Sequence, residues 1–539
     1  MKKFKKIMAL AIAMVMVLSM SISVFAEGEK TITAPNNGHT YEIFQIFTGT
    51  VSEGKLVNLK YGTNAVGTLN ADVTQADITK LNAIKDAGTT VAQDQADIAA
   101  MAEFVNLNSS PVATIKDGQT YAAPVGYYLI RDKAGTVPTN EQYTLYLMSV
   151  VNEDITITPK TSTTTSEKKL DDVNDSDGTS QTLQDSADYD IGDAVPYHLK
   201  ATIAENISAY KKYHLTFQDT LEAGSFSAIS DLTIKVDGTD ISTGTFTGFT
   251  VTKTVTTAPT VNGFDITLTF NPSGEGVTLL PASLAGKNVT IDFTATLGEG
   301  AKIGQEGNVN TFVLKYSNNP NSTDDSEEGT TPEDTVIVFT YELDVNKTDA
   351  AGEPLNGATF ALYKKYATVP SGKTAATSPI TYGNDKSYTI PSGTNYVLVG
   401  TISGTDKSLF EFKGIDDGEY LLVETVTPTG YNAIAPQTFS VTAEHTATAD
   451  INKTTKKDAN GSYVLTSVSG AKTGDSTITL SQHTKDSKIT GVDTTIVNES
   501  GAVLPSTGGI GTTIFYIIGA ILVIGAGVVL VTRRRMSAN

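Results

Sequence analysis

The sequence contains no cysteine and no tryptophan, and it has only five histidines in 539 residues. Without cysteine there is neither a disulfide nor a thiolate metal site. The histidines are scattered, and none has the spacing of a motif such as HExxH. Catalytic sequences such as GxSxG or a P-loop do not stand out. We therefore predict no metal, no cofactor and no enzymatic active site.

The N-terminal residues have the composition of an export signal. In "MKKFKKIMALAIAMVMVLSMSISVFA" four lysines precede an apolar run, and Val24 and Ala26 occupy the −3 and −1 positions of a cleavage site. This order of basic, apolar and small residues is typical of a secretory signal peptide. We predict that residues 1–26 are removed from the mature protein.

The C-terminal residues form the longest uncharged run of the chain. Residues 510–532 contain no charged side chain, and Arg533, Arg534 and Arg535 follow directly. At about 1.5 Å per residue such a helix crosses a bilayer core of roughly 30 Å. Basic flanks stay in the cytoplasm. We predict a transmembrane segment at 510–532 and a cytoplasmic tail at 533–539, with the rest of the mature protein outside the cell.

The portion between the two ends is strongly acidic. It carries all 59 acidic side chains against 32 basic ones, a net charge of −27. Such a surface repels nucleic acid and anionic lipid. We therefore expect neither as a partner.

The exported portion is long enough for about three domains. Threonine, valine, isoleucine, tyrosine and glycine are plentiful, and most segments alternate with period two, which predicts a mainly β protein of tandem immunoglobulin-like β-sandwich domains. Composition changes divide it into domains at 27–160, 161–335 and 336–500, followed by a C-terminal region at 501–509. The first domain also has two helical patterns, around Leu81 and Met101, which predict helical insertions.

Strand alternation places three polar residues of the last domain on apolar faces. Lys347 follows Tyr341, Leu343 and Val345 on one face in "YELDVNK". Glu424 shares a face with leucine and valine in "YLLVETV", and Asn498 shares one with isoleucine in "TTIVNES". The three lie on the first, a middle and the last strand of the domain.

The preceding domain repeats this order with aspartate as the acid. Lys168 lies at its start, Asp219 continues the apolar face of "YHLTFQDTL", and Asn318 continues that of "TFVLKYSNN". The alternatives Lys169 and Asn319 are separated from these only by the strand alternation. The first domain shows no comparable set.

Burial of these three residue types supports a particular reaction. An apolar site lowers the pKa of a lysine toward the nucleophilic amine and raises that of a carboxyl toward the protonated acid. The acid then polarises the asparagine carboxamide and shuttles protons while the amine displaces ammonia. We predict two single-turnover, intramolecular Lys–Asn isopeptide bonds, assisted by Asp219 and Glu424. Polar residues at solvated strand ends are the alternative.

The last two domains contain three further motifs: "EPLNGATFALYK" and "YLLVETVTPTGY" in the third domain, and "DSADYDIGDAVPYHL" through "YSNNPN" in the second. Together they resemble the Gram-positive, sortase-assembled major (backbone) pilins of the SpaA type. The first is similar to the start of CnaB-type domains, and the second to the pilin E-box, except for Thr427 where alanine is usual. The last resembles a CnaA-type second domain. The resemblance implies that Glu424 and Asp219 assist isopeptide formation.

The end of the exported portion resembles the LPxTG sorting signal of that family, placed before an apolar span and a basic tail. Its residues are Leu504, Pro505, Ser506, Thr507 and Gly508. The resemblance implies cleavage after Thr507 by a sortase and attachment to peptidoglycan.

A lysine at the end of the first domain lies in a segment that resembles a second motif of that family. "VNEDITITPK" resembles the pilin motif, although Thr158 replaces its tyrosine and the common leading tryptophan is absent. The family's nucleophilic lysine corresponds to Lys160. A surface lysine without such a role is the alternative.

The resemblance implies a structural subunit of a covalent, wall-anchored pilus on the cell surface. Its expected partners are a class C pilus sortase, a housekeeping sortase, further copies of the chain, accessory pilins, peptidoglycan and a host surface ligand. The alternative is a monomeric wall-anchored adhesin that binds a host matrix protein, which would not need Lys160. The sequence shows no catalytic motif that would support a third class, a wall-anchored hydrolase.

Overall fold

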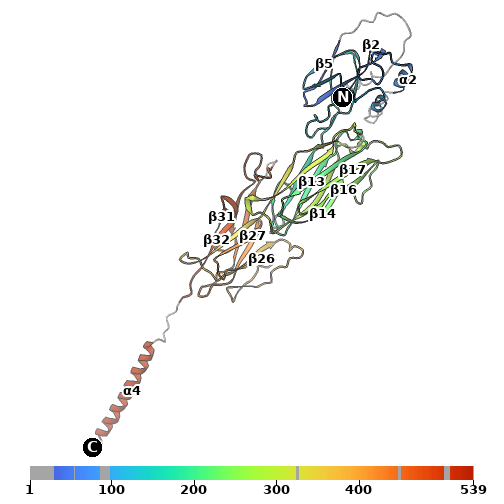
Figure 1. Cartoon of the computed structure of the whole chain (residues 1–539). Helices are drawn as coiled ribbons and strands as arrows, with labels where there is room; N and C mark the ends of the chain where they lie inside the picture. Colours follow the sequence, from blue (N-terminus) through green and yellow to red (C-terminus); the bar gives the residue numbers. More distant parts are fainter. Residues whose placement is uncertain are drawn as a thin grey trace.

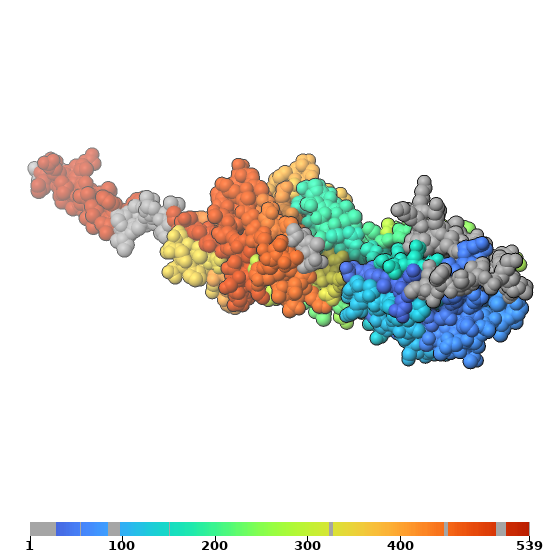
Figure 2. Space-filling view, turned by 90° about the horizontal axis from the view of Figure 1, so that it is seen from above, coloured from blue at the N-terminus to red at the C-terminus, as the bar shows by residue number. Residues whose placement is uncertain are grey.

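The computed structural model describes residues 29–53, 55–84, 97–322, 327–446, 451–502 and 510–537. The predicted signal peptide and the LPSTG sequence lie outside the described residues. Three β-rich blocks follow one another in a row, and helix α4 (Ile510–Met536) points away from the last of them (Figures 1 and 2). The mainly β class is therefore confirmed.

The first block contains two sheets and a helix. The smaller sheet has the order β5-β1-β8, and the larger has the order β3-β2-β6-β7 with β4 paired to β2. Helix α2 (Gln75–Ala83) begins after Thr74, whose side chain accepts a hydrogen bond from the Asp77 amide, and it buries Leu81. The first predicted helical insertion is thus confirmed, whereas the described residues of the second form only a short helical segment at 97–101. The strands are β1 (Lys30–Thr33), β2 (Thr40–Ser52), β3 (Lys55–Tyr61), β4 (Ala113–Lys116), β5 (Thr120–Ala123), β6 (Gly126–Asp132), β7 (Leu147–Val151) and β8 (Ile155–Thr156).

The second block is a sandwich of two sheets. One has the order β10-β9-β12-β18-β14-β15 and the other β11-β21-β19-β13-β17-β16, with β20 paired to β19. Alternate residues of β12, β13 and β18 are buried, which gives each sheet one apolar face. The strands are β9 (Ser166–Val173), β10 (Ser180–Gln184), β11 (Ser186–Asp188), β12 (Ala194–Thr202), β13 (Tyr213–Leu221), β14 (Phe226–Val236), β15 (Thr239–Asp240), β16 (Phe249–Thr260), β17 (Gly263–Pro272), β18 (Asn288–Leu297), β19 (Asn308–Ser317), β20 (Glu328–Thr330) and β21 (Asp334–Phe339).

The third block has sheets of order β27-β22-β32-β31 and β26-β23-β28-β29-β30, with a separate β24–β25 hairpin. Its first and last strands, β22 and β32, run side by side in parallel. This pairing brings residues that are far apart in the chain to one place. The strands are β22 (Tyr341–Asp349), β23 (Thr359–Tyr366), β24 (Ile380–Tyr382), β25 (Lys386–Tyr388), β26 (Asn395–Ser403), β27 (Leu409–Ile415), β28 (Gly418–Val426), β29 (Gln437–His445), β30 (Leu465–Lys472), β31 (Leu480–Lys485) and β32 (Lys488–Asn498).

The second and third blocks meet at Thr340. Strand β21 pairs with β19 and β11 of the second block. Strand β22 pairs within the third block, and Thr340 is the one residue between the two strands. Ile337 and Phe339 of β21 belong to the apolar core of the third block. We therefore propose Thr340 as the boundary, a few residues beyond the division at 335 that composition indicates.

Helix α4 is the one described helix that is long and apolar enough to cross a membrane. Its apolar part precedes Arg533, and the helix continues through the three arginines to Met536. The predicted span at 510–532 therefore ends within a longer helix.

Candidate functional site: two buried clusters of lysine, acid and asparagine

The third block buries the predicted lysine, glutamate and asparagine together. Lys347 on β22 lies opposite Ile496 of β32, two residues before Asn498. The Asn498 Nδ2 donates to Glu424 Oε2 on β28 at 3.0 Å, and to the Asn432 carbonyl at 2.7 Å. All three side chains are almost completely buried. The structure thus brings the three predicted residues together from three strands.

The environment of this cluster prepares the lysine for attack. Burial lowers the pKa of Lys347 to about 8, although Glu424 nearby opposes the shift. The Lys347 ammonium donates to the backbone carbonyls of Thr348 and Ile496 at 2.8 and 3.2 Å. The Asn498 Oδ1 has no hydrogen-bond partner among the described residues. That unpartnered oxygen is where negative charge develops when an amine attacks the carboxamide.

A threonine that departs from the E-box pattern also contacts the cluster. Thr427 Oγ1 donates to Glu424 Oε2 at 2.9 Å, on the same carboxyl oxygen that accepts from Asn498. This hydrogen bond holds the Glu424 carboxyl against the asparagine. Threonine at this position therefore adds a hydrogen bond to the site.

The second block contains a second buried pair. Lys168 Nζ on β9 donates to Asp219 Oδ2 on β13 at 2.5 Å, and both side chains are fully buried. The ammonium also lies over the rings of Tyr197 and Phe293, at 5.1 and 5.5 Å. Burial lowers the pKa of Lys168 and raises that of Asp219. Both shifts favour the uncharged amine and the protonated acid.

The asparagine beside this pair is Asn310, so the prediction of Asn318 differs from the structure. Asp219 pairs with Phe312 on β19, and Asn310 is two residues away on the same face. Asn310 lies beside the Asp219 carboxyl and opposes a part of the rise in its pKa that burial causes. Both polar atoms of the Asn310 side chain are buried, and among the described residues neither has a hydrogen bond of good geometry. Asn318 is six residues from Phe312 in the other direction, or about 20 Å along a strand. A lysine side chain does not span that distance.

Asn318 instead lies where the first and second blocks meet. Its carbonyl accepts a hydrogen bond from the Tyr143 amide at 2.8 Å. Alternation of side chains along β19 gives Asn310 and Asn318 the same face, so alternation alone does not distinguish them. The register of β19 against β13 does distinguish them, because it places Asp219 beside one asparagine and far from the other.

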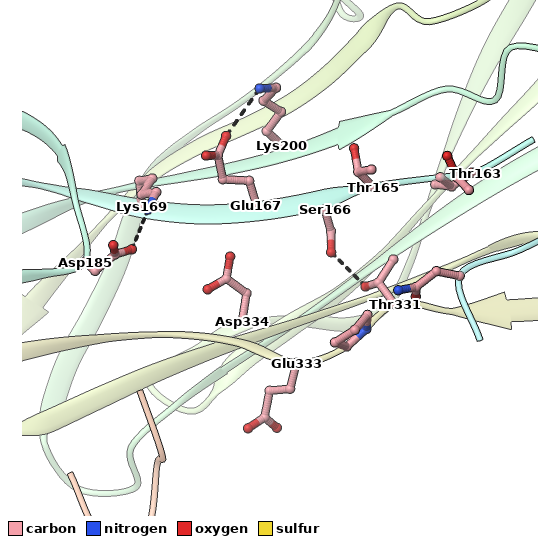
Figure 3. A pocket seen from close by; sticks show the side chains of 13 residues that line it. Thr163, Thr165, Ser166, Glu167, Lys169, Asp185, Lys200, Thr331, Glu333 and Asp334 are labelled. Atoms are coloured by element: carbon pink, nitrogen blue, oxygen red, sulfur yellow. Dashed lines mark hydrogen bonds and ion pairs between the residues drawn. The ribbon is translucent and has the colours of Figure 1, made fainter. Parts of the chain in front are cut away.

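Lys169, the alternative to Lys168, lies beside an open polar recess of about 690 Å³ (Figure 3). Glu167 and Lys169 line this recess, and Lys169 donates to Asp185 at 2.6 Å. Lys168, between them, points to the opposite side of the strand and into the core. The arrangement favours Lys168, and it places the neighbouring lysine in a partly exposed ion pair.

Lys160 lies between the first and second blocks, three residues before Thr163, which lines this recess. Its amide donates to Thr144 Oγ1 at 2.8 Å, and its carbonyl accepts from the Leu145 amide at 3.4 Å. The side chain is partly exposed. The backbone of the predicted nucleophile is therefore held in place at a junction, outside any apolar core.

The first block has a buried ionisable group of another kind. His39 Nδ1 is 2.8 Å from Asp132 Oδ1, and its Nε2 is 2.8 Å from Glu141 Oε2. In the described part of this block no lysine is buried.

These features define a class of protein. Tandem β-rich blocks precede an apolar helix that is long enough to cross a membrane and has a basic end, and an LPSTG sequence lies between them, as in the precursor of a surface protein anchored to the cell wall. Comparison with known proteins identifies two of the parts. Residues 341–457 match the SpaA prealbumin-like fold domain, and residues 496–537 match the LPXTG cell wall anchor motif. The chain therefore contains a SpaA-type domain and an LPXTG anchor.

One relative in sequence and two solved structures extend the comparison. The chain is 26% identical over 307 residues to the trypsin-resistant surface T6 protein of Streptococcus pyogenes serotype M6, which covers 49% of this chain and 52% of the relative. The structure of the T6 backbone pilin of that serotype aligns with 89% of this chain and all of its own, at 17% identity and a TM-score of 0.50. The major pilin SpaD of Corynebacterium diphtheriae aligns with 89% of this chain and 99% of its own, at 16% identity and a TM-score of 0.42.

The chain thus spans about half the length of the T6 relative that it matches in sequence. The structural likeness to the T6 backbone pilin supports the three-block fold. The sequence relative is named as a surface protein and the aligned T6 structure as a backbone pilin, and neither name describes an enzyme.

Proposed function

We propose that this chain is the backbone subunit of a covalent, wall-anchored pilus. The observation that carries the proposal is the combination of Lys160 at the junction of the first two blocks with an LPSTG sequence ahead of the membrane helix. The two sites supply the amine and the acyl group of an amide bond. The amine lies before the second block and the acyl group after the third. Copies of such a chain can therefore be joined end to end without limit.

The polymerising reaction needs a sortase as the outside catalyst. Its cysteine thiolate attacks the Thr507 carbonyl, the bond to Gly508 breaks, and the membrane-bound end is released. The Lys160 amine of another subunit then attacks the thioester, which forms a Thr507–Lys160 amide and frees the thiol. A pilus sortase would use Lys160, whereas a housekeeping sortase would use the amine of a peptidoglycan precursor and end growth. Accessory pilins and a host surface ligand are further expected partners.

The internal bonds are the second element of the proposal. In the third block the Lys347 amine attacks the Asn498 carboxamide carbon, Glu424 carries a proton from the amine to the leaving group, and ammonia departs. In the second block the same reaction joins Lys168 to Asn310 with Asp219 as the proton carrier. Each bond ties the first strand of a block to one of its last strands.

The test is a comparison of lysine variants in cells that carry the cognate sortase. Lys160→Ala should abolish the high-mass ladder in wall extracts and leave wall-anchored monomer. Lys169→Ala, which removes a nearby lysine of the recess, should leave the ladder unchanged. A ladder that persists in Lys160→Ala would refute polymerisation through this residue, and wall-anchored monomer in the unaltered protein would favour the adhesin.

A further inference from the structure

A group of ionisable side chains, one buried and two half-buried, lies where the second block meets the third. Asp172 at the end of β9 and Asp188 at the end of β11 come from the second block, and His445 at the end of β29 comes from the third. His445 Nε2 is 3.9 Å from Asp172 Oδ2 and 3.9 Å from Asp188 Oδ2. The three atoms lie within 4.8 Å of one another. None of these residues takes part in isopeptide formation or polymerisation.

The contacts of His445 with Ser186 orient the imidazole ring so that Nε2 faces the two acids. Ser186 Oγ is 3.1 Å from His445 Nδ1 and 3.4 Å from the His445 carbonyl oxygen. When the serine hydroxyl donates its proton to that carbonyl, its oxygen accepts the proton of Nδ1. Nε2 is then free to bind a cation between the two carboxyl groups.

This arrangement brings one oxygen of each of two carboxyl groups close to an imidazole nitrogen. Asp188 is 2% exposed, and its Oδ2, which faces the histidine, has no hydrogen-bond partner in the described parts of the chain. The Tyr341 hydroxyl lies beside it, also buried and outside ideal hydrogen-bond geometry. A buried anion left without a partner is costly. The site therefore calls for a cation at its centre.

A neighbouring cluster at the same junction shows the contrast. There the Lys364 ammonium donates to Asp175 at 3.1 Å, to Asp190 at 2.9 Å and to Asp416. An ammonium has three N–H donors, so these contacts use all of them. Asp172 and Asp188 instead face the His445 ring, whose Nε2 is 3.9 Å from each.

We propose that Asp172, Asp188 and His445 form a binding site for a divalent cation of the zinc type, which fastens the second block to the third. One imidazole nitrogen and two carboxylate oxygens are a ligand set that zinc accepts, with water or the Tyr341 hydroxyl near the fourth position. Tetrahedral zinc with bonds of about 2.0–2.1 Å separates its ligands by roughly 3.3 Å, so the side chains would move inward by about half an ångström. The Ser186 contact fixes the ring as partners of metal-bound histidines do.

The site is independent of the proposed pilus function, and its test measures metal directly. The full chain, purified in detergent and treated with a chelator that is then removed, should bind one Zn²⁺ per molecule in calorimetry and elemental analysis. Co²⁺ in its place should give the visible absorption of a tetrahedral site with nitrogen and oxygen ligands. Ca²⁺ and Mg²⁺, which prefer oxygen ligands alone, should bind at least tenfold more weakly.

Variants locate the metal. His445→Gln and Asp188→Asn should each lower zinc affinity at least tenfold. His483→Gln is the matched control, because His483 Nε2 also faces two acids, Glu342 and Asp344, at 3.8 and 3.4 Å, but is more exposed. It should leave the affinity unchanged. The absence of zinc uptake by the unaltered chain would mean that a proton neutralises the site and would overturn the proposal, as would uptake that depends on His483 and not on His445. The Co²⁺ spectrum of the unaltered chain decides the matter if a variant fails to fold.

Discussion

Replacing Glu424 with glutamine should prevent one covalent bond while changing the shape of the third block very little. Glutamine has the size of glutamate and can still accept the hydrogen bond from Asn498, but it does not carry a proton between the Lys347 amine and the leaving group. The mass of the variant should exceed that of the unaltered protein, corrected for the substitution, by one ammonia. The bond in the second block, which depends on Asp219, should still form.

The loss of stability follows from the loop that the bond closes. Lys347 and Asn498 are about 150 residues apart, and a cross-link of that span restricts the unfolded chain by about 5 kcal/mol on the chain-entropy estimate used for disulfides. For a block of about this size, 1 kcal/mol corresponds to roughly 2–4 °C in the midpoint of unfolding. The third block of the Glu424→Gln variant should therefore melt about 10–20 °C lower than in the unaltered protein.

The assay combines intact mass with calorimetry, and Glu419→Gln is the matched control. Glu419 is on the same strand, β28, but its partly exposed side chain pairs with Lys365 at 2.7 Å. Its replacement should change neither the ammonia loss nor the melting temperature by more than a degree or two, because exposed ion pairs contribute little. If Glu424→Gln still loses both ammonia molecules, the assignment of Glu424 as the assisting acid is wrong.

Two further predictions concern the other blocks. Asn310→Ala should prevent the ammonia loss in the second block, whereas Asn318→Ala should not. Tandem mass spectrometry of the Lys168 peptide would show which asparagine it is joined to, and the reverse result would assign the bond to Asn318. The first block should melt at a higher temperature near pH 6 than above pH 8. Burial opposes the charge of His39, but the hydrogen bonds to Asp132 and Glu141 outweigh it and raise its pKa above the ordinary value of 6.5. A raised pKa contributes stability that is fully present below about pH 6.5 and is lost as the pH rises through the folded value. His39→Gln should flatten this dependence in calorimetry, and an unchanged dependence would contradict the role of His39.

Strand alternation was sufficient to find residues that face the core, and the third block shows why. Lys347, Glu424 and Asn498 each continue an apolar face, and the structure places them together. In the second block alternation selected Lys168, Asp219 and Asn318, although Asn310 lies on the same face of β19 as Asn318. That choice depends on the register between β13 and β19, which is set by pairing across the sheet.

The junction of the second and third blocks could not be predicted in this way. Asp172, Asp188 and His445 are far apart in the sequence, and no short spacing marks them as ligands. They meet because β21 continues almost directly into β22 and brings the ends of β11 and β29 together. The expectation that the chain has no metal site rested on the absence of cysteine and on the spacing of the histidines. Spacing reports on ligands within one segment and not on ligands from two blocks, so it does not test the proposed site.

The path of force through the proposed fibre explains where cross-links are needed. Tension applied between Lys160 and Thr507 of one subunit passes through the second and third blocks. The first block precedes Lys160 in the chain and therefore lies outside that path. The first block accordingly has His39 with two acids where the others have a lysine and an asparagine. With both bonds formed, force bypasses residues 169–309 and 348–497, because it crosses from Lys168 to Asn310 and from Lys347 to Asn498. The loaded chain between the bonds is then residues 311–346, which include β21 and the passage to β22. A cation held by Asp172, Asp188 and His445 would join the blocks at this same passage, so the proposed metal site lies where covalent protection ends.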